Sequence, residues 1–183
     1  MTREEALDSV KDNVENDNLV KHMLATEAIM RALARHLGED EENWGLTGLI
    51  HDIDVELTGG DMSEHSKLGA DLAKELGASE DMAHAILCHN QEHGIPLETQ
   101  LAKALYCADP LTGLIIAAAL VRPDKKLANL EAKSVIKRFK EKGFAAGADR
   151  QQISMCSEIG LELDEFIELG LKAIKGIADD LGL

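Results

Sequence analysis

The hexapeptide "LIHDID" at residues 49–54 places an imidazole, His51, directly beside a carboxylate, Asp52, at the end of an apolar segment. Two other polar residues share such surroundings: His22 falls on an apolar face at helical spacing, and Asp109 ends the segment "ALYCAD". An unpaired carboxylate is costly to bury, and a divalent cation is the simplest partner that satisfies neutral imidazoles and carboxylates together. The sequence therefore predicts a metal site built from separate helices.

The elements that position these residues are predicted to be helices. Only five residues are aromatic, so the core must be built from Leu, Ile, Ala and Met, which suits packed helices. "NDN" at 16–18 supplies the N-cap of a helix that Gly38 ends, and Ser63 and Ser79 can cap the helices of "EHSKLGADLAKEL" and "EDMAHAILCHN". At Pro110 we expect a helix to kink or restart. The expected fold class is an all-α helical bundle.

The length of the chain, 183 residues, fits one domain with a substantial core. Its last third repeats the amphipathic pattern in shorter segments separated by glycines. We therefore expect a single domain over residues 1–183, with a ligand-bearing core at about 18–122 and a C-terminal helical extension at about 123–183.

Charge and composition argue against several classes of partner. Lys and Arg total 19 against 34 Asp and Glu, a formal charge of -15, which repels nucleic acid and anionic lipid. The acidic start "MTREEALDSV" is unlike a signal peptide, and the longest apolar run, residues 114–121, is too short to span a bilayer. Cys88, Cys107 and Cys156 are interpreted as reduced thiols. We expect a cytoplasmic protein with no nucleic-acid or membrane partner, and the oligomeric state is not predicted.

The order of His22, the His51-Asp52 pair and Asp109 on successive helices resembles the HD-domain superfamily of metal-dependent phosphohydrolases. The resemblance covers residues 20 to about 120 and implies an HD-domain helical bundle with additional C-terminal helices. Two more histidines, in "EHSKLGA" and "AILCHN", stand where the two-metal branch of the superfamily places further ligands. The metal ligands that the resemblance implies are His22, His51, Asp52, His65, His89 and Asp109.

Within that branch, "HSKLGADLA", "AHAILCHN" and "AKALYCADPL" look most like the HD proteins that hydrolyse diadenosine tetraphosphate symmetrically. The chain departs from this group in three places. Val55 stands where a Lys commonly follows the His-Asp motif, "PLTGLI" follows Asp109, and "HNQEHG" follows the fourth helix. The resemblance to this group therefore supports the metal-binding centre better than it supports the identity of the substrate. We expect a small phosphorylated substrate of the nucleotide type.

Two metal ions at this set of ligands would support hydrolysis. Water held between cations about 3.5 to 4 Å apart becomes a nucleophile, and the cations neutralise charge on the phosphoryl oxygens. Asp52 has two oxygens and can bridge the pair, which makes it a predicted catalytic residue. We expect one side of the bridge to be filled by His22, His51 and Asp109, and the other side by His65 and His89.

The proton for the leaving group needs a donor, because Val55 replaces the usual Lys. The predicted donors are Lys67, Lys21 or a metal-bound water, and we take Lys67 as the catalytic candidate among the side chains. The nitrogen and oxygen ligands fit one or two divalent ions of Fe, Mn, Co, Ni or Zn.

Several residues have other interpretations. A single inward histidine is more often a hydrogen-bonded core residue than a ligand, and His36 and His84 are interpreted as structural or surface residues. His93, beside Gly94, is interpreted as a solvated loop residue, with the alternative that it reaches into the mouth of the site. Cys88 and Cys107 fit small buried hydrophobes better than a thiolate zinc site.

Asp54 and Glu56 fit solvated loop charges, or support for the neighbouring ligands through hydrogen bonds. Two other functions also remain open. One is a di-iron oxygenase, as in the HD branch that resembles inositol oxygenase. The other is a non-catalytic module that binds metal and senses a nucleotide.

Overall fold

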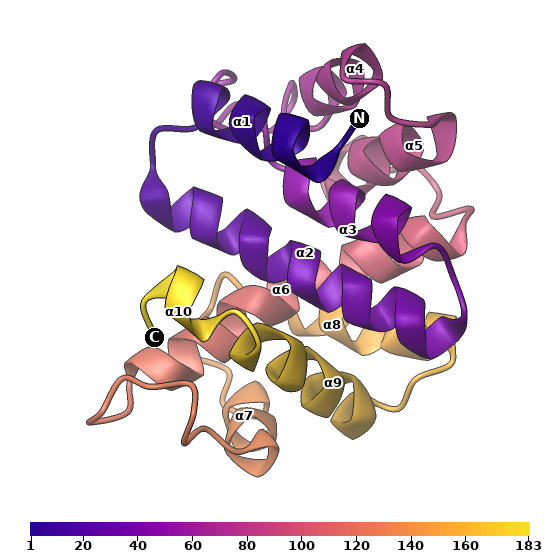
Figure 1. The fold of residues 1–183 in the computed structure, drawn as a ribbon. Helices are drawn as coiled ribbons and strands as arrows, with labels where there is room; N and C mark the ends of the chain where they lie inside the picture. The colour runs from indigo at the N-terminus through magenta and orange to yellow at the C-terminus, as the bar shows by residue number, and fades with distance from the viewer.

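The computed structural model describes residues 1–183 as ten α-helices and two short 3-10 helices, without a β-strand (Figure 1). The predicted all-α fold class is confirmed. In chain order the elements are α1 (Arg3–Asn13), α2 (Asp17–Leu37), α3 (Glu41–Ile50), α4 (Lys67–Glu75), α5 (Glu80–His89), η1 (Gln91–His93), α6 (Gln100–Leu120), α7 (Ala132–Phe139), α8 (Arg150–Ser154), η2 (Met155–Ile159), α9 (Leu163–Lys175) and α10 (Ala178–Leu181).

The ends of several helices follow predicted capping residues. The Asn16 side chain accepts a hydrogen bond from the backbone N–H of Asn18 at the start of α2, and Gly38 ends that helix with a left-handed backbone, φ 78°. Ser79 caps α5 in the same way, and Asp40 caps α3. Such caps satisfy N–H groups that no helical carbonyl can reach.

The structure departs from two predicted details of the helix boundaries. Ser63 lies in a run of turns and does not cap a helix, because α4 begins later, at Lys67, after the buried Ser66. Of the kink or restart expected at Pro110, the restart does not occur, because Pro110 lies inside the continuous helix α6. Pro110 is buried, so the surrounding core holds the helix together despite the backbone hydrogen bond that proline cannot donate.

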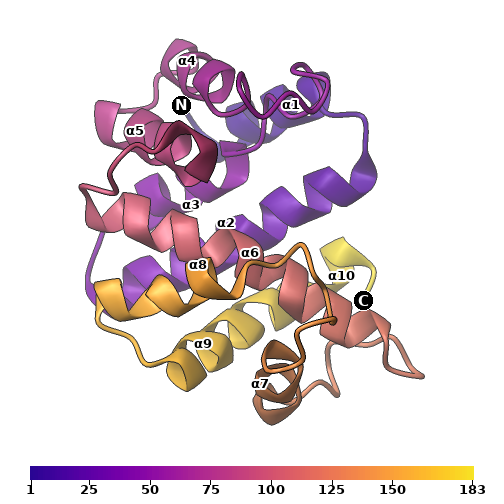
Figure 2. The same ribbon diagram turned by 180° about the vertical axis from the view of Figure 1, so that it is seen from behind.

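Helix α6 is the central element of the molecule (Figures 1 and 2). It packs against α2 and α5, which precede it in the chain, and against α8 and α9, which follow it. By length and composition this helix could cross a membrane, but 67% of its apolar window is buried inside the protein, as in a core helix. One cluster of 45 buried apolar residues runs from Ala6 to Leu181. Helices from both ends of the chain therefore share one core, while the division at about residue 122 stays a prediction.

Helices α2 and α3 approach each other closely, and this pair carries His22 and leads into the His51-Asp52 pair. A Cβ atom on Gly48 would lie 2.9 Å from the carbonyl oxygen of Thr26 and 3.0 Å from the backbone nitrogen of Glu27. Because those are backbone atoms, only glycine permits the approach.

Glu27 on α2 shows how this chain satisfies a buried carboxylate. Its side chain is 4% exposed and accepts hydrogen bonds from the guanidinium groups of Arg3, at 2.7 and 2.8 Å, and Arg31, at 2.9 Å. Arg31 also donates to Glu42 on α3 at 2.8 Å, so the network joins α1, α2 and α3. Here a fixed positive charge faces the buried negative charge.

We predict that Gly48→Ala lowers the free energy of unfolding by about 1–3 kcal/mol, the usual cost of overpacking a core. The matched control is Gly113→Ala on α6, where a Cβ would meet nothing within 4 Å and better helix propensity should add up to about 1 kcal/mol. Urea unfolding of both variants measures the difference. Equal stability for Gly48→Ala and the parent would show that the α2–α3 approach is not tight.

Candidate metal centre

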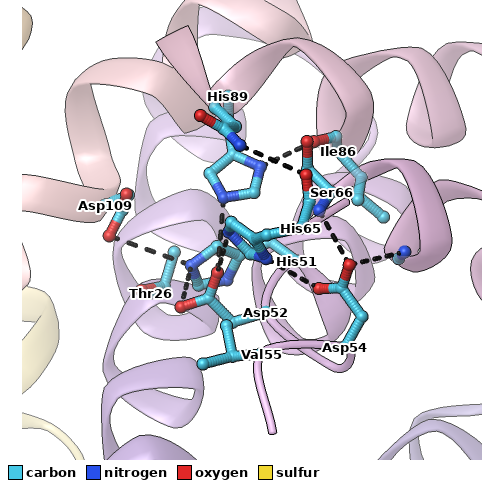
Figure 3. Close-up of polar contacts among 12 residues, drawn as sticks. Thr26, His51, Asp52, Asp54, Val55, His65, Ser66, Ile86, His89 and Asp109 are labelled. Atoms are coloured by element: carbon cyan, nitrogen blue, oxygen red, sulfur yellow. Dashed lines mark hydrogen bonds and ion pairs between the residues drawn. The ribbon is translucent and has the colours of Figure 1, made fainter. Parts of the chain in front are cut away.

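The six predicted ligands converge where α2, α3, α5 and α6 meet (Figure 3). Two of them come from the interior of long helices, one from the last residue of α5, and three from the end of α3 and the turns that follow it. In Figure 3 the labelled side chains of His51, Asp52, His65, His89 and Asp109 point toward one another. The full set is His22 on α2, His51 and Asp52 after α3, His65 before α4, His89 on α5 and Asp109 on α6.

A first group of possible ligands consists of His22, His51 and Asp109, whose ligand atoms all lie within 4.8 Å of one another. His22 Nε2 lies 3.0 Å from Asp109 Oδ1 and 3.3 Å from His51 Nε2, and His51 Nε2 lies 3.8 Å from Asp109 Oδ1. Two atoms each bound at about 2.1 Å to one ion lie about 3.0 to 3.4 Å apart in octahedral or tetrahedral geometry. Two of the three separations fall in this range, and the third, between His51 Nε2 and Asp109 Oδ1, is longer at 3.8 Å.

Asp52 faces imidazoles with both of its oxygens. Its Oδ2 lies 3.4 Å from His51 Nε2 and 3.7 Å from His22 Nε2. Its Oδ1 lies 3.3 Å from His89 Nε2 and 3.5 Å from His65 Nε2. Each oxygen therefore faces a different pair of histidines, which is the arrangement of a carboxylate that can bridge two ions.

Two of the histidines are held by backbone carbonyls one helical turn earlier. Nδ1 of His51 donates to the carbonyl of Gly48 at 2.9 Å, and Nδ1 of His89 donates to the carbonyl of Ile86 at 2.6 Å. A carbonyl can only accept, so the proton of each neutral ring sits on Nδ1. The lone pair of each Nε2 is thus left facing the cluster.

In the other two histidines, side-chain acceptors place the proton on Nδ1. The Thr112 hydroxyl donates to the carbonyl of Asp109 at 2.6 Å, so it must accept from Nδ1 of His22 at 2.8 Å. Asp54 accepts from Nδ1 of His65 at 2.9 Å. All four Nε2 atoms therefore face the carboxylates, and in the neutral rings each would offer its lone pair to a bound cation.

The close approach of imidazoles and carboxylates shifts the pKa values of the cluster in the metal-free protein. Burial disfavours a charged ring at His51, but the negative charges of Asp52 and Asp109 outweigh it and raise the pKa of His51 to about 9. Burial acts against ionisation of Asp52 and Asp109 as well, yet the facing histidines hold the pKa of both carboxyls below the ordinary value. Protons on imidazole therefore neutralise the cluster when no metal does.

The cluster opens into a hollow of about 300 Å³. Asp52 and Asp109 reach it with side chains 14% and 26% exposed, whereas His51 is fully buried. No Lys or Arg lines the hollow, and only Val55 and Met62 are apolar. The lining residues are Asp52, Val55, Thr58, Gly60, Met62, His65, His89, Asn90, Gln91, Asp109 and Gln152.

The lysines predicted as proton donors lie elsewhere. Lys67 is exposed and lines a different hollow, beside Lys74 and His84. Lys21 lines a third hollow, near the C-terminal residue Leu183. The structure does not bring either lysine to the cluster, and the catalytic role of Lys67 stays a prediction.

Sequence reasoning missed several residues that support the ligands. The Asn90 side chain donates to the carbonyl of Met62 at 2.8 Å, and His93 Nε2 donates to the carbonyl of His65 at 2.8 Å, so "HNQEH" fastens the turn that carries His65. Thr112 stands one helical turn after Asp109, a spacing that could have been noticed. Gln152 reaches the hollow from α8, and no sequence signal connects it to the cluster.

The cysteines lie outside the cluster's ligand set. All three are free and buried, as predicted. Burial raises the pKa of Cys88 to about 11 and that of Cys107 further, so these thiols stay protonated at neutral pH and are poor metal ligands. His36 lies at the surface, 3.7 Å from Glu165, also as predicted.

Comparison with known proteins identifies the family. The HD domain matches residues 19–134, more than half of the chain, and the chain belongs to the HD-domain family. Ribonuclease Y of Oleidesulfovibrio alaskensis is 30% identical over 149 residues, which cover 81% of this chain and 27% of the relative. Ribonuclease Y of Lawsonia intracellularis is 32% identical over 130 residues, covering 71% and 23%. No solved structure matches.

The family match confirms the predicted HD domain, and together with the His/Asp cluster it supports the prediction of a metal-dependent phosphohydrolase. The chain spans only about a quarter of the length of these relatives. The finer likeness to the diadenosine tetraphosphate hydrolases finds no support among them.

The predicted partners are wrong. We expected a small phosphorylated substrate and no nucleic acid, but the relatives are named for acting on RNA. The exclusion of nucleic acid came from the net charge of -15, which governs contacts made by surface lysines and arginines, and the small substrate came from the resemblance to the diadenosine tetraphosphate hydrolases. A site that holds cations can offset the charge of a phosphate locally, whatever the average charge of the surface.

We predict that binding of Mn²⁺ to the metal-free protein releases protons and strengthens as pH rises. With a pKa of about 9, His51 is protonated at neutral pH, and an imidazole must lose that proton to bind a metal. Affinity should rise about tenfold per pH unit from pH 7 and level off above about pH 9. Calorimetry in buffers of different ionisation enthalpy counts the protons, with the surface variant His36→Gln as control. A flat pH profile would contradict the protonated state of His51.

Proposed function

We propose that this chain hydrolyses phosphodiester bonds in RNA, with a pair of divalent cations held on the two oxygens of Asp52. The substrate class rests on the relatives named ribonuclease Y. The pair of cations rests on one observation: Oδ2 of Asp52 faces His22 and His51, while Oδ1 faces His65 and His89.

Two cations bound there would supply a hydroxide nucleophile near neutral pH and offset charge on the scissile phosphate. The chain supplies the rest. His22, His51 and Asp109 would hold the cation on one side of Asp52. His22 Nε2 lies at coordination-shell separations from both Asp109 Oδ1 and His51 Nε2, 3.0 and 3.3 Å. The phosphate enters beside Asp52 and Asp109, which line the hollow.

The wall of the hollow is suited to the uncharged parts of a nucleotide chain. Thr58, Gln91 and Gln152 present hydroxyl and amide groups, and Met62 is an exposed apolar side chain on the same wall. Gln152 bonds to Asp149 through its backbone N–H at 3.1 Å, which leaves the side-chain amide available to a ligand. Amides can both donate to and accept from ribose hydroxyls and base edges.

The first test is metal-dependent cleavage of an unstructured, end-labelled RNA oligonucleotide with Mn²⁺. We expect Asp52→Asn to lower kcat about a thousandfold or more, because several kcal/mol of charge stabilisation are lost and each 1.36 kcal/mol is about a factor of ten. Asp71→Asn, an exposed aspartate on α4, is the control. Full activity of Asp52→Asn would overturn the proposal.

Isotope labelling separates hydrolysis from the oxidative alternative. Turnover in oxygen-18 water should place the label on the phosphate of the product. RNA left intact, together with metal-dependent uptake of molecular oxygen, would instead assign the centre to an oxygenase.

The position of Gln152 in the wall of the hollow predicts that the C-terminal region contributes to substrate binding. Gln152→Ala should raise KM for the RNA oligonucleotide about threefold to tenfold with kcat and metal content unchanged, since a net hydrogen bond contributes about 0.5–1.5 kcal/mol. Gln151→Ala is the matched control, because its exposed side chain does not line the hollow. Identical KM values in the two variants would remove Gln152 from the substrate site.

A further inference from the structure

Asp54 differs from the other groups that orient the histidines of the cluster. His22, His51 and His89 each donate from Nδ1 to a neutral oxygen, of a hydroxyl or a carbonyl. His65 alone donates to a carboxylate, that of Asp54, which is fully buried. Figure 3 shows His65 between Asp52 and Asp54, with one ring nitrogen toward each.

The local backbone is built to hold Asp54 as an ionised acceptor. Oδ2 of Asp54 accepts from the backbone N–H groups of Ser66 at 2.7 Å and Gly69 at 2.9 Å, at the start of α4. Ser66 directs its N–H there from a left-handed conformation, φ 71°, which costs energy for a residue other than glycine. A Cβ on Gly69 would lie 3.1 Å from the carboxyl carbon of Asp54. The start of α4 therefore fits closely around the carboxylate of Asp54.

The two sides of Asp52 are unequal in charge. On the Oδ2 side, Asp109 adds a second carboxylate to His22 and His51. On the Oδ1 side, His65 and His89 have no second carboxylate within the cluster. A divalent ion bound there would be short of one negative charge relative to its neighbour.

We propose that Asp54 is the positioning residue of the second cation site. It fixes His65 with Nε2 toward Asp52 and, through the ring, supplies the negative charge that this side of the cluster lacks. The inference rests on the two-cation centre proposed above. It also explains the second aspartate of "LIHDID": Asp52 faces the ions directly, and Asp54 acts one imidazole away.

The test is calorimetric titration of the metal-free full chain with Mn²⁺. Parent protein should take up two ions. Asp54→Asn should weaken the second about 10–100-fold, the usual effect of removing the partner of a metal-binding histidine, and leave the first unchanged. Asn has nearly the same volume as Asp. Asp54, however, is the acceptor in each of its hydrogen bonds, and the NH₂ group of an amide cannot accept one.

Two further variants keep the test decisive. Gly69→Ala retains the charge of Asp54 but crowds it, and should weaken the same second ion even if Asp54→Asn folds poorly. Thr112→Val removes the acceptor of His22 on the other side, and should weaken the first ion instead. Burial lowers the pKa of His65, but Asp54 and Asp52 outweigh it and raise that pKa, so histidine nitrogen-15 spectra of the metal-free protein are recorded at alkaline pH, where the ring is neutral. They should show His65 as a single Nδ1–H tautomer that becomes mixed in Asp54→Asn.

The outcomes separate the two proposals. One ion in the parent protein would overturn the two-cation centre. If the parent binds two ions, and Asp54→Asn and Gly69→Ala bind both with the same affinities as the parent, the two-cation centre stands and the role of Asp54 is overturned.

Discussion

Imidazole lone pairs and carboxylate oxygens converge on one small volume in this protein, and no lysine or arginine lies among them. Four Nε2 atoms face Asp52 and Asp109 at 3.0 to 3.8 Å. Elsewhere the chain pairs a buried carboxylate with guanidinium groups, as Arg3 and Arg31 do for Glu27. The cluster has only protons or metal cations to satisfy it, which is why the pKa of His51 is raised when metal is absent.

The scaffold serves this convergence. Gly48 lets α2 and α3 approach closely enough for His22 and His51 to meet, and its own carbonyl orients the His51 ring. Helix α6 passes through the core as one element, so Asp109 is fixed from a buried helix and not from a loop. The ligands therefore depend on tertiary packing, and changes to the core should reach the metal site.

The sequence allowed the helical class to be predicted, and the six residues expected as ligands do lie together in the structure. Polar groups in apolar surroundings indicated His22, the His51-Asp52 pair and Asp109, whereas His65 and His89 were expected only from the resemblance to the HD-domain superfamily. The groups that hold the histidines in place were harder to predict from the sequence. A carbonyl such as that of Ile86 has no sequence signature, and Ser66 adopts a left-handed backbone because Asp54 binds its N–H across 12 residues. Gln152 meets the cluster only through the packing of α8 on α6. The nucleic-acid partner was excluded wrongly because net charge averages over a surface, whereas a phosphate responds to the local charge of a site.

The central claim, that Asp52 joins two cation sites, is tested most directly by anomalous scattering from crystals of the full chain loaded with Mn²⁺. The account predicts two anomalous peaks about 3.5 to 4 Å apart. One should lie within bonding distance of Asp52 Oδ2, His22, His51 and Asp109, and the other of Asp52 Oδ1, His65 and His89. A single peak at saturating Mn²⁺, or two peaks that do not share Asp52, would contradict it.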